Sequence, residues 1–287
     1  MTLIDYDLVH TVAADGTKLA VRTIDGDGRL VVALHGFTGN GATMLPLLDA
    51  ARDGRPVLAP DLVGHGESAA PDHTEPYTMA SVVDQVLSLI GPRPPGSVHL
   101  VGYSMGGRVA LSMAARAPWY FASVTTISST PGLADPKERA ERAEHDVATA
   151  ARLEEQGLST FIGSWLDLPL FAPYIASLDA EALEATIEQR RTNTVGGLAH
   201  SLRGTGTGSM PPVWDALGSL RSPLLAIAGE RDPKYTEIAR AMATTAPNGA
   251  ARIVPDAGHV VHVERPAQVA ESLVEFLASC ERVWDNQ

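Results

Sequence analysis

The segment VHLVGYSMGG, residues 98–107, joins a short apolar run to a G-x-S-x-G motif centred on Ser104. Val98–Val101 has the length of a buried strand, and Met105–Ala117 has the composition of a helix. A strand that turns sharply into a helix at this motif is the context of a nucleophile elbow, which holds its serine in a strained turn at the carboxyl edge of a sheet. The motif therefore predicts a reactive Ser104. The alternative is a chance occurrence of a short pattern, so the surrounding residues must decide.

Other apolar runs without polar alternation lie on both sides of this motif, as expected for parallel strands that are buried on both faces. They are Leu30–Leu34, Val57–Ala59, Val124–Ile127, Leu224–Ala228 and Arg252–Val254. Helical stretches separate them at Met44–Arg52, Met79–Ile90, Tyr235–Ala246 and Pro266–Ser279. Before them, Leu8–Val12 and Lys18–Ile24 predict a hairpin with its turn at Asp15-Gly16. This alternation predicts an α/β fold, with a mostly parallel central sheet and helices on both faces.

Residues 133–209 interrupt the alternation, because from Asp135 to about Ser209 the sequence has helical patterns and no strand. The stretches 134–156 and 180–191 are rich in small, charged and helix-forming residues. The glycine-rich stretch Leu198–Gly208 is expected to form loops. We therefore predict a core made of residues 1–132 and 210–287, with a helical cap of residues 133–209 inserted over the sheet.

The composition is that of a folded soluble protein, with 45% hydrophobic and 20% charged residues among 287. Cys280 is the only cysteine, so an internal disulfide and a Cys-rich metal site are excluded. The net charge of −12 argues against a nucleic-acid partner. Met1–His10 lacks the pattern of a signal peptide, and no run of about 18 apolar residues predicts a membrane span. We expect a cytoplasmic protein, either a monomer or a weak homodimer.

Partners for Ser104 follow in the order that an elbow serine requires, acid first and histidine second. A serine hydroxyl reacts poorly until a neighbouring base takes its proton. Asp232 and His259 each follow a predicted strand, and the carboxyl ends of parallel strands share one edge of the sheet. Taken singly, Asp232 could be a turn residue beside Pro233 and His259 a loop histidine. Their order and placement together predict a Ser104–His259–Asp232 triad.

The other histidines near these strand ends are His35, His65 and His262. His35 and His65 precede the elbow and so stand in the wrong order, whereas His262 could be mistaken for the base. His35-Gly36-Phe37 follows the first core strand, where the second amide of an oxyanion hole is expected. We assign that hole to the backbone N–H groups of Phe37 and Met105. The alternative for this stretch is a simple glycine turn.

With these motifs the chain resembles the α/β-hydrolase superfamily over its whole length. The core motifs are HGFTG at 35–39, DLVGHGES at 61–68, the elbow at 102–106, and Gly258-His259 followed by Glu264-Arg265-Pro266. Finer features resemble the 2-succinyl-6-hydroxy-2,4-cyclohexadiene-1-carboxylate synthase family. These are GYSMGGR at 102–108, ERAER at 138–142, Trp165, RRTN at 190–193, GTGTG at 204–208, PPVW at 211–214 and GERDPKY at 229–235. The resemblance implies an α/β-hydrolase fold with a helical cap insert.

The resemblance also implies a lyase of menaquinone biosynthesis that eliminates pyruvate from 2-succinyl-5-enolpyruvyl-6-hydroxy-3-cyclohexene-1-carboxylate. In this family the triad acts as a base and no cofactor or metal is needed. Gly204–Gly208 lacks the Lys-Ser/Thr end of a phosphate-binding loop. The partner that the resemblance implies is this substrate, a small polycarboxylate.

Arginines would hold the carboxylates of that substrate. The resemblance assigns this role to Arg108, Arg142 and Arg191, and it places Tyr103 and Trp165 in the pocket wall. The alignment of the cap is looser, so Arg139 could replace Arg142, and Arg190 could replace Arg191. The cap arginines could instead lie on solvated helix faces, paired with Glu138, Glu141 and Glu188.

Arg108 is the arginine whose position is fixed best, because it lies one helical turn after Ser104. A carboxylesterase for neutral esters would not need it. A hydrolase that cleaves an ester or a C–C bond through an acyl-enzyme at Ser104 nevertheless remains the main alternative, especially for a substrate that carries carboxylates. A non-catalytic binding module is a third reading, which an intact triad disfavours.

Overall fold

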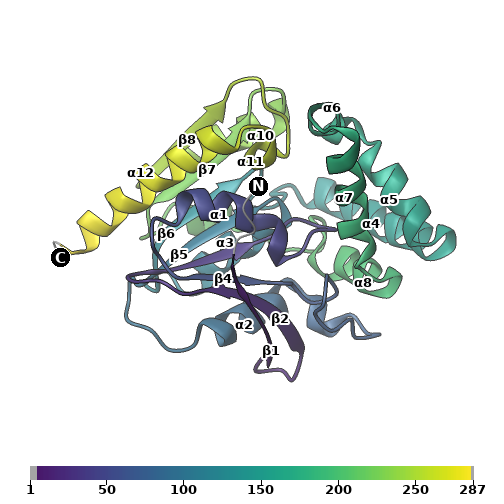
Figure 1. Ribbon diagram of the computed structural model, residues 1–287, viewed down its shortest axis with the longest axis horizontal. Coiled ribbons are helices and arrows are strands. Elements are labelled where there is room, and N and C mark those ends of the chain that lie inside the picture. Colours follow the sequence, from purple (N-terminus) through teal and green to yellow (C-terminus); the bar gives the residue numbers. More distant parts are fainter. Residues whose placement is uncertain (1–4, 286–287) are drawn as a thin grey trace.

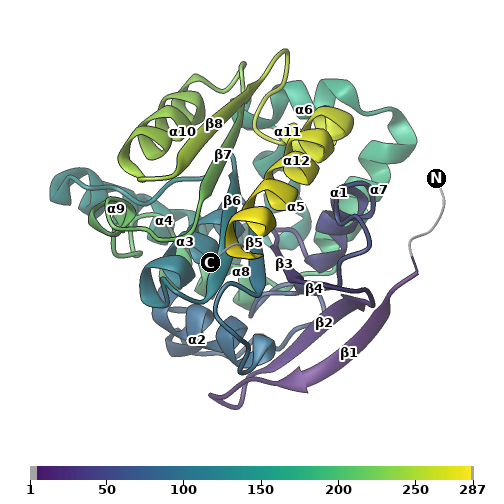
Figure 2. The same cartoon turned by 90° about the vertical axis from the view of Figure 1, so that its left-hand side faces the viewer.

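An eight-stranded sheet forms the centre of the computed structural model, which describes residues 5–285 (Figures 1 and 2). The strand order is β1-β2-β4-β3-β5-β6-β7-β8. Only the β1–β2 and β2–β4 pairs are antiparallel, so the sheet is mostly parallel, as predicted. The strands are β1 Asp7–Val12, β2 Lys18–Ile24, β3 Leu30–Leu34, β4 Val57–Pro60, β5 Val98–Tyr103, β6 Phe121–Ile127, β7 Leu224–Gly229 and β8 Gly249–Val254. The extreme ends of the predicted core, 1–4 and 286–287, lie outside the described residues, as does the start of the Met1–His10 stretch.

Helices cover both faces of this sheet, which confirms the predicted α/β-hydrolase architecture. They are α1 Leu45–Ala51, α2 Met79–Ile90, α3 Met105–Arg116, α9 Trp214–Leu217, α10 Pro233–Thr245, α11 Val261–Glu264 and α12 Pro266–Asp285, with short 3-10 turns η1 Gly41–Met44 and η2 Glu75–Tyr77. The face that carries α1 and α12 buries Leu48 and Leu273 (Figure 2). The opposite face buries Val86, Val109 and Met242 of α2, α3 and α10. Two apolar layers therefore hold the sheet rigid beneath the loops that follow its strands.

The segment from α4 to α8, between β6 and α9, forms a separate group of helices at one side of the sheet (Figure 1, teal to green). They are α4 Pro136–Gln156, α5 Leu158–Leu166, η3 Pro169–Phe171, α6 Ala172–Ser177, α7 Ala180–Arg191 and α8 Val195–Thr205. The carboxylate of Asp135 accepts hydrogen bonds from two backbone N–H groups in the first turn of α4 and so caps it. Leu153, Phe161 and Leu198 form a small apolar core within this cap. No helix among residues 5–285 is long and apolar enough to cross a membrane.

Helix α8 contradicts the expectation that Leu198–Gly208 forms loops as far as Thr205, whereas residues 206–208 lie in a turn after the helix. The hydroxyl of Thr194 accepts a hydrogen bond from the N–H of Gly197 at 3.0 Å and caps the helix. Its glycines permit close packing: a Cβ on Gly197 would lie 2.3 Å from the Gly64 oxygen, and a Cβ on Gly204 would lie 2.4 Å from the Tyr77 oxygen. Tertiary contact with the core thus overrides the low helix propensity of glycine.

Candidate active site

The elbow at Ser104 is a tight connection between β5, which ends at Tyr103, and α3, which begins at Met105. Ser104 has a φ of 48°, in the region that side-chain-bearing residues rarely adopt. A Cβ on Gly102 would lie 2.4 Å from the Gly106 oxygen, and a Cβ on Gly106 would lie 2.1 Å from the Leu34 oxygen. Both glycines are therefore required by close backbone approach, and the turn fixes the serine at the carboxyl edge of the sheet.

A continuous chain of contacts joins Ser104 to the two residues expected as its partners. Asp232 follows β7 and His259 follows β8, and both side chains are buried. Nδ1 of His259 lies 2.7 Å from Oδ2 of Asp232, and Nε2 lies 3.2 Å from Oγ of Ser104. With Nδ1–H donating to the carboxylate, the lone pair on Nε2 faces the serine hydroxyl. The arrangement can therefore remove the hydroxyl proton of Ser104.

The three other histidines near the strand ends, His35, His65 and His262, have different environments. Nε2 of His35 accepts a hydrogen bond from the Leu62 N–H at 2.9 Å, and His65 packs edge to face against Phe37. Burial lowers the pKa of His35 to about 4, and it lowers the pKa of both His65 and His262 to about 3. These rings are neutral at pH 7, and within residues 5–285 the imidazole in hydrogen-bond contact with Oγ of Ser104 is that of His259.

Phe37 and Met105, whose backbone N–H groups are the predicted oxyanion hole, both belong to the wall of the cavity that contains Ser104. Phe37 lies in a turn after β3 that is closed by the Gly39 N–H on the Gly36 oxygen at 3.0 Å. The N–H of Phe37 donates to no other group within residues 5–285, and Met105 is the first residue of α3, where N–H groups lack partners in the helix. Phe37 and Met105 both line the cavity that contains Ser104, so the pair can meet a developing negative charge there.

A cavity of about 270 Å³ lies between the elbow and the cap. Its wall contains Ser104, His259, Phe37, Met105, Tyr103, Trp165, Arg108 and Arg142 from the predicted set, and also Arg190, Lys234 and Tyr235. Trp165 packs edge to face on Phe37. Burial raises the pKa of Tyr103, so its hydroxyl stays protonated. The cavity thus combines a reactive serine with several cationic side chains.

Arg108 is buried at the floor of this cavity, with only 8% of its surface exposed. One Nη donates to the backbone oxygen of Thr205 at 2.8 Å, whereas Nε has no hydrogen-bond partner among the described residues. Burial lowers the pKa of Arg108 to about 10, and the positive charge of Arg142 contributes to the lowering. The site therefore holds a desolvated cation that pairs with no carboxylate of residues 5–285, which is an environment that favours an anionic ligand.

The cap arginines differ in part from the expectation. Nε of Arg142 forms an ion pair with Asp146 at 2.7 Å and still lines the cavity. Arg191, the predicted contact, is 45% exposed in its side chain and pairs with Glu188 outside the cavity, while its neighbour Arg190 faces inward. Arg139 donates to the Leu133 oxygen and is not part of the lining.

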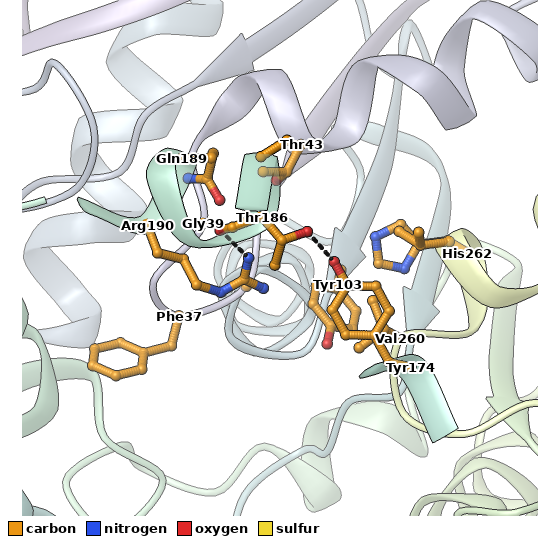
Figure 3. Close-up of a pocket in the computed structure, with 13 residues that line it drawn as sticks. Phe37, Gly39, Thr43, Tyr103, Tyr174, Thr186, Gln189, Arg190, Val260 and His262 are labelled. Atoms are coloured by element: carbon orange, nitrogen blue, oxygen red, sulfur yellow. Dashed lines mark hydrogen bonds between the residues drawn. The ribbon is translucent and has the colours of Figure 1, made fainter. Parts of the chain in front are cut away.

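A second cavity of about 240 Å³ adjoins the first and shares Phe37, Tyr103 and Arg190 with it (Figure 3). Arg190 Nη1 donates to the Thr186 oxygen at 2.9 Å, and the guanidinium lies between Phe37 and Tyr103 in this view. The sequence analysis preferred Arg191 and gave Arg190 only as the alternative. It did not predict Lys234 and Tyr235 as cavity residues, although their position just after Asp232 places them near the site. Among residues 5–285, no group of three or more His, Cys, Asp or Glu side chains is arranged to hold a metal ion.

The fold and the elbow define an α/β hydrolase, and the alpha/beta hydrolase family model matches residues 31–272. A Bacillus subtilis (strain 168) protein named as a putative 2-succinyl-6-hydroxy-2,4-cyclohexadiene-1-carboxylate synthase is 35% identical over 94% of this chain and 98% of its own length. The solved structure of MenH from S. aureus is 30% identical, with a TM-score of 0.83 over 91% of this chain and 98% of that one. An esterase structure from Thermogutta terrifontis is 25% identical, with a TM-score of 0.76 over 96% and 99% of the two chains. The chain belongs to the alpha/beta hydrolases and, among them, to the 2-succinyl-6-hydroxy-2,4-cyclohexadiene-1-carboxylate synthase family.

Proposed function

We propose that this protein is a carbon–oxygen lyase of menaquinone biosynthesis. Its substrate would be 2-succinyl-5-enolpyruvyl-6-hydroxy-3-cyclohexene-1-carboxylate, from which it eliminates pyruvate. The observation that carries the proposal is that Arg108, Arg142 and Arg190 line the same cavity as Ser104 and His259. The substrate has three carboxylates, on the ring, the succinyl chain and the enolpyruvyl group, and guanidinium groups bind carboxylates through strong charge-assisted hydrogen bonds. The name of the Bacillus relative supports the same substrate.

In this proposal Ser104 acts as a base. His259 takes the hydroxyl proton on Nε2, across the observed 3.2 Å contact, and Asp232 stabilises the imidazolium through Nδ1. The serine oxygen then accepts the proton from ring carbon 2, which is acidified by the adjacent succinyl ketone. The negative charge that develops on the ketone oxygen faces the N–H groups of Phe37 and Met105, which stabilise it.

The electrons of the broken C2–H bond form a C2=C3 double bond as the charge returns from the ketone oxygen. The electrons of the C3=C4 bond shift to C4=C5, and the bond between C5 and the enolpyruvyl oxygen breaks. Pyruvate leaves as its enolate, which accepts a proton and becomes the keto acid. This sequence converts the 3-cyclohexene into the 2,4-cyclohexadiene, and the proton taken from C2 balances the proton that the leaving group gains. It requires no acyl-enzyme.

A hydrolase that attacks an ester or C–C bond through Ser104 is the second candidate. The strained elbow and the two oxyanion N–H groups would serve nucleophilic attack equally well, and the Thermogutta structure is an esterase. The buried Arg108 favours the lyase, because a neutral ester offers nothing to offset the desolvation of its charge. In either case we propose a small-molecule partner; the cytoplasmic location and the oligomeric state stay predictions.

The test is the release of pyruvate from the enolpyruvyl substrate, followed through the oxidation of NADH by lactate dehydrogenase. Reactions without enzyme provide the background, because the substrate could lose pyruvate unaided. Accelerated pyruvate release with the wild-type protein supports the lyase. Rapid hydrolysis of nitrophenyl esters without accelerated pyruvate release would replace it by the hydrolase.

A further inference from the structure

Asn193 links the cap to the loop that forms one half of the oxyanion hole. It lies just after α7, and only 5% of its surface is exposed. Its Nδ2 donates to the backbone oxygen of Thr38 at 2.9 Å and to that of Arg190 at 2.8 Å. Its Oδ1 accepts a hydrogen bond from the Gly66 N–H at 3.1 Å. One buried amide thus joins three separate backbone segments.

The segment held by Asn193 has a backbone conformation that its own sequence does not favour. Thr38 has a φ of 67°, at the third position of the turn from Gly36 to Gly39, where glycine is the usual residue. Positive φ is unfavourable for a β-branched residue and persists only when the surroundings fix it. Thr38 is 1% exposed, and its hydroxyl has no hydrogen-bond partner among the described residues. Its carbonyl, however, accepts the 2.9 Å hydrogen bond from Asn193, and Gln189 approaches the same oxygen at 3.5 Å.

The same turn sets the direction of the Phe37 N–H, since Phe37 immediately precedes Thr38. An oxyanion donor is effective only if it is held in place before the charge develops, and small misplacements are costly. Arg190 lies on α7 three residues before Asn193 and faces the cavity beside Phe37 (Figure 3). Asn193 therefore joins the end of α7, which carries Arg190, to the turn that carries the Phe37 N–H.

We propose that Asn193 is a positioning residue that holds the Phe37–Thr38 turn of the oxyanion hole against the end of α7. The inference deepens the proposed function, because it rests on an oxyanion forming at that turn. Asn193 itself does not touch the reacting atoms. Its amide acts through the Thr38 carbonyl, while its bond to the Arg190 carbonyl anchors the amide to the end of α7.

Two variants separate the bonds that Asn193 makes. Asn193→Asp, as a carboxylate, keeps the size and the acceptor for the Gly66 N–H but loses both donated bonds, to the Thr38 and Arg190 oxygens, whereas Asn193→Ala removes all three bonds. We expect kcat for pyruvate release to fall by roughly 10- to 100-fold in both, with KM changing by less than about threefold, because the loss concerns the transition state. In Asn193→Ala the pH dependence of kcat should keep its wild-type form, since the triad is untouched and no titratable group is added. If the alanine variant does not fold, the aspartate variant carries the test.

Thr74→Val is the matched control. It removes another hydrogen bond between the cap and the core, the one that joins Thr74 Oγ1 and His200 Nδ1 at 3.1 Å, without contact to the oxyanion turn. Its kcat should stay at the wild-type value. Wild-type kcat in folded Asn193→Asp, or an equal loss in Thr74→Val, would overturn the inference and leave a merely structural cap contact. If the wild type itself releases no pyruvate, the proposed function fails separately, and the same comparison is made on nitrophenyl ester hydrolysis, which uses the same hole.

Discussion

Replacement of Arg108 by methionine tests the link between the buried charge and the substrate. Methionine keeps much of the length of the side chain and removes the guanidinium. Arg108 lines the cavity, is 8% exposed and is held by one hydrogen bond to the Thr205 oxygen. We expect Arg108→Met to lose affinity for the transition state without losing the fold.

The size of the effect follows from the burial of the charge. Lowering the pKa of Arg108 from 12.5 to about 10 corresponds to a cost of roughly 3 kcal/mol for keeping the guanidinium charged in the folded protein. A substrate carboxylate that pairs with Arg108 can contribute a binding free energy of similar size. Removal of one partner from a buried, hydrogen-bonded charge pair costs about 2–5 kcal/mol, which corresponds to roughly a 30- to 5,000-fold fall in kcat/KM.

The folded state of Arg108→Met should be as stable as the wild type or more stable, although its activity falls. The arginine has an Nε without a hydrogen-bond partner among the described residues, and a buried ion replaced by an apolar side chain of similar volume is often neutral or stabilising. The Thr205 carbonyl loses a donor, which offsets part of the gain. We therefore expect the Tm of Arg108→Met, measured by scanning calorimetry without ligand, to equal or exceed that of the wild type.

The assay is pyruvate release coupled to lactate dehydrogenase, with Arg116→Met as the matched control. Arg116 lies on the same helix but is 62% exposed in its side chain and pairs with Asp84 at the surface, so its variant should keep wild-type kcat/KM. Wild-type kcat/KM in Arg108→Met would refute the reasoning, because the buried cation would then have no carboxylate to hold. A marked fall in Tm would refute the stability argument.

Three further outcomes follow from the site. Ser104→Ala should lower kcat by about 1,000-fold or more in the coupled assay while leaving residual turnover from the remaining donors, and near wild-type kcat would exclude Ser104 as the base. Arg190→Ala should lower kcat/KM by at least about tenfold and Arg191→Ala by less than about twofold, because only the first faces the cavity; the reverse order would restore the sequence-based choice. Burial lowers the pKa of His65 and His262 to about 3, so between pH 6.5 and 3 the unfolded chain binds more protons and the free energy of unfolding falls as the pH falls. Urea denaturation should show His262→Phe to be less acid-sensitive, by up to about 1.4 kcal/mol per pH unit, and an unchanged slope would contradict a neutral, buried ring.

The core could be predicted from the sequence because its signals are local and mutually consistent. Each apolar run is a strand in the structure, and parallel strands place their carboxyl ends at one edge. Residues that follow those ends, such as Ser104, Asp232 and His259, are therefore brought together although they lie far apart in the chain. The strand order brings these positions close together, and the residue types at them then indicate the chemistry.

The cap could not be predicted to the same depth, because its outcome depends on contacts with the core. Gly197 and Gly204 indicate a loop by propensity, yet both lie in a helix whose backbone approaches the core too closely for a side chain. Arg190 and Arg191 are adjacent on α7, where one residue turns the side chain by about 100°. Which of them faces inward depends on how α7 packs on the loop after β3, and composition does not encode that packing.

The placement of the arginines explains how an acidic chain could take up a substrate with three negative charges. The net charge of −12 repels such a molecule at long range, but solvent ions screen this repulsion beyond about 10 Å. Inside the cavity the screening is weaker, and Arg108, Arg142, Arg190 and Lys234 are close enough to dominate the local field. Within the part of the chain that the structure describes, only Arg142 among the three arginines has a carboxylate partner, Asp146, so much of this positive charge is unneutralised there. If Arg108 binds a substrate carboxylate as proposed, binding and stability are opposed at this residue: the desolvation that weakens the folded protein strengthens the attraction for a carboxylate.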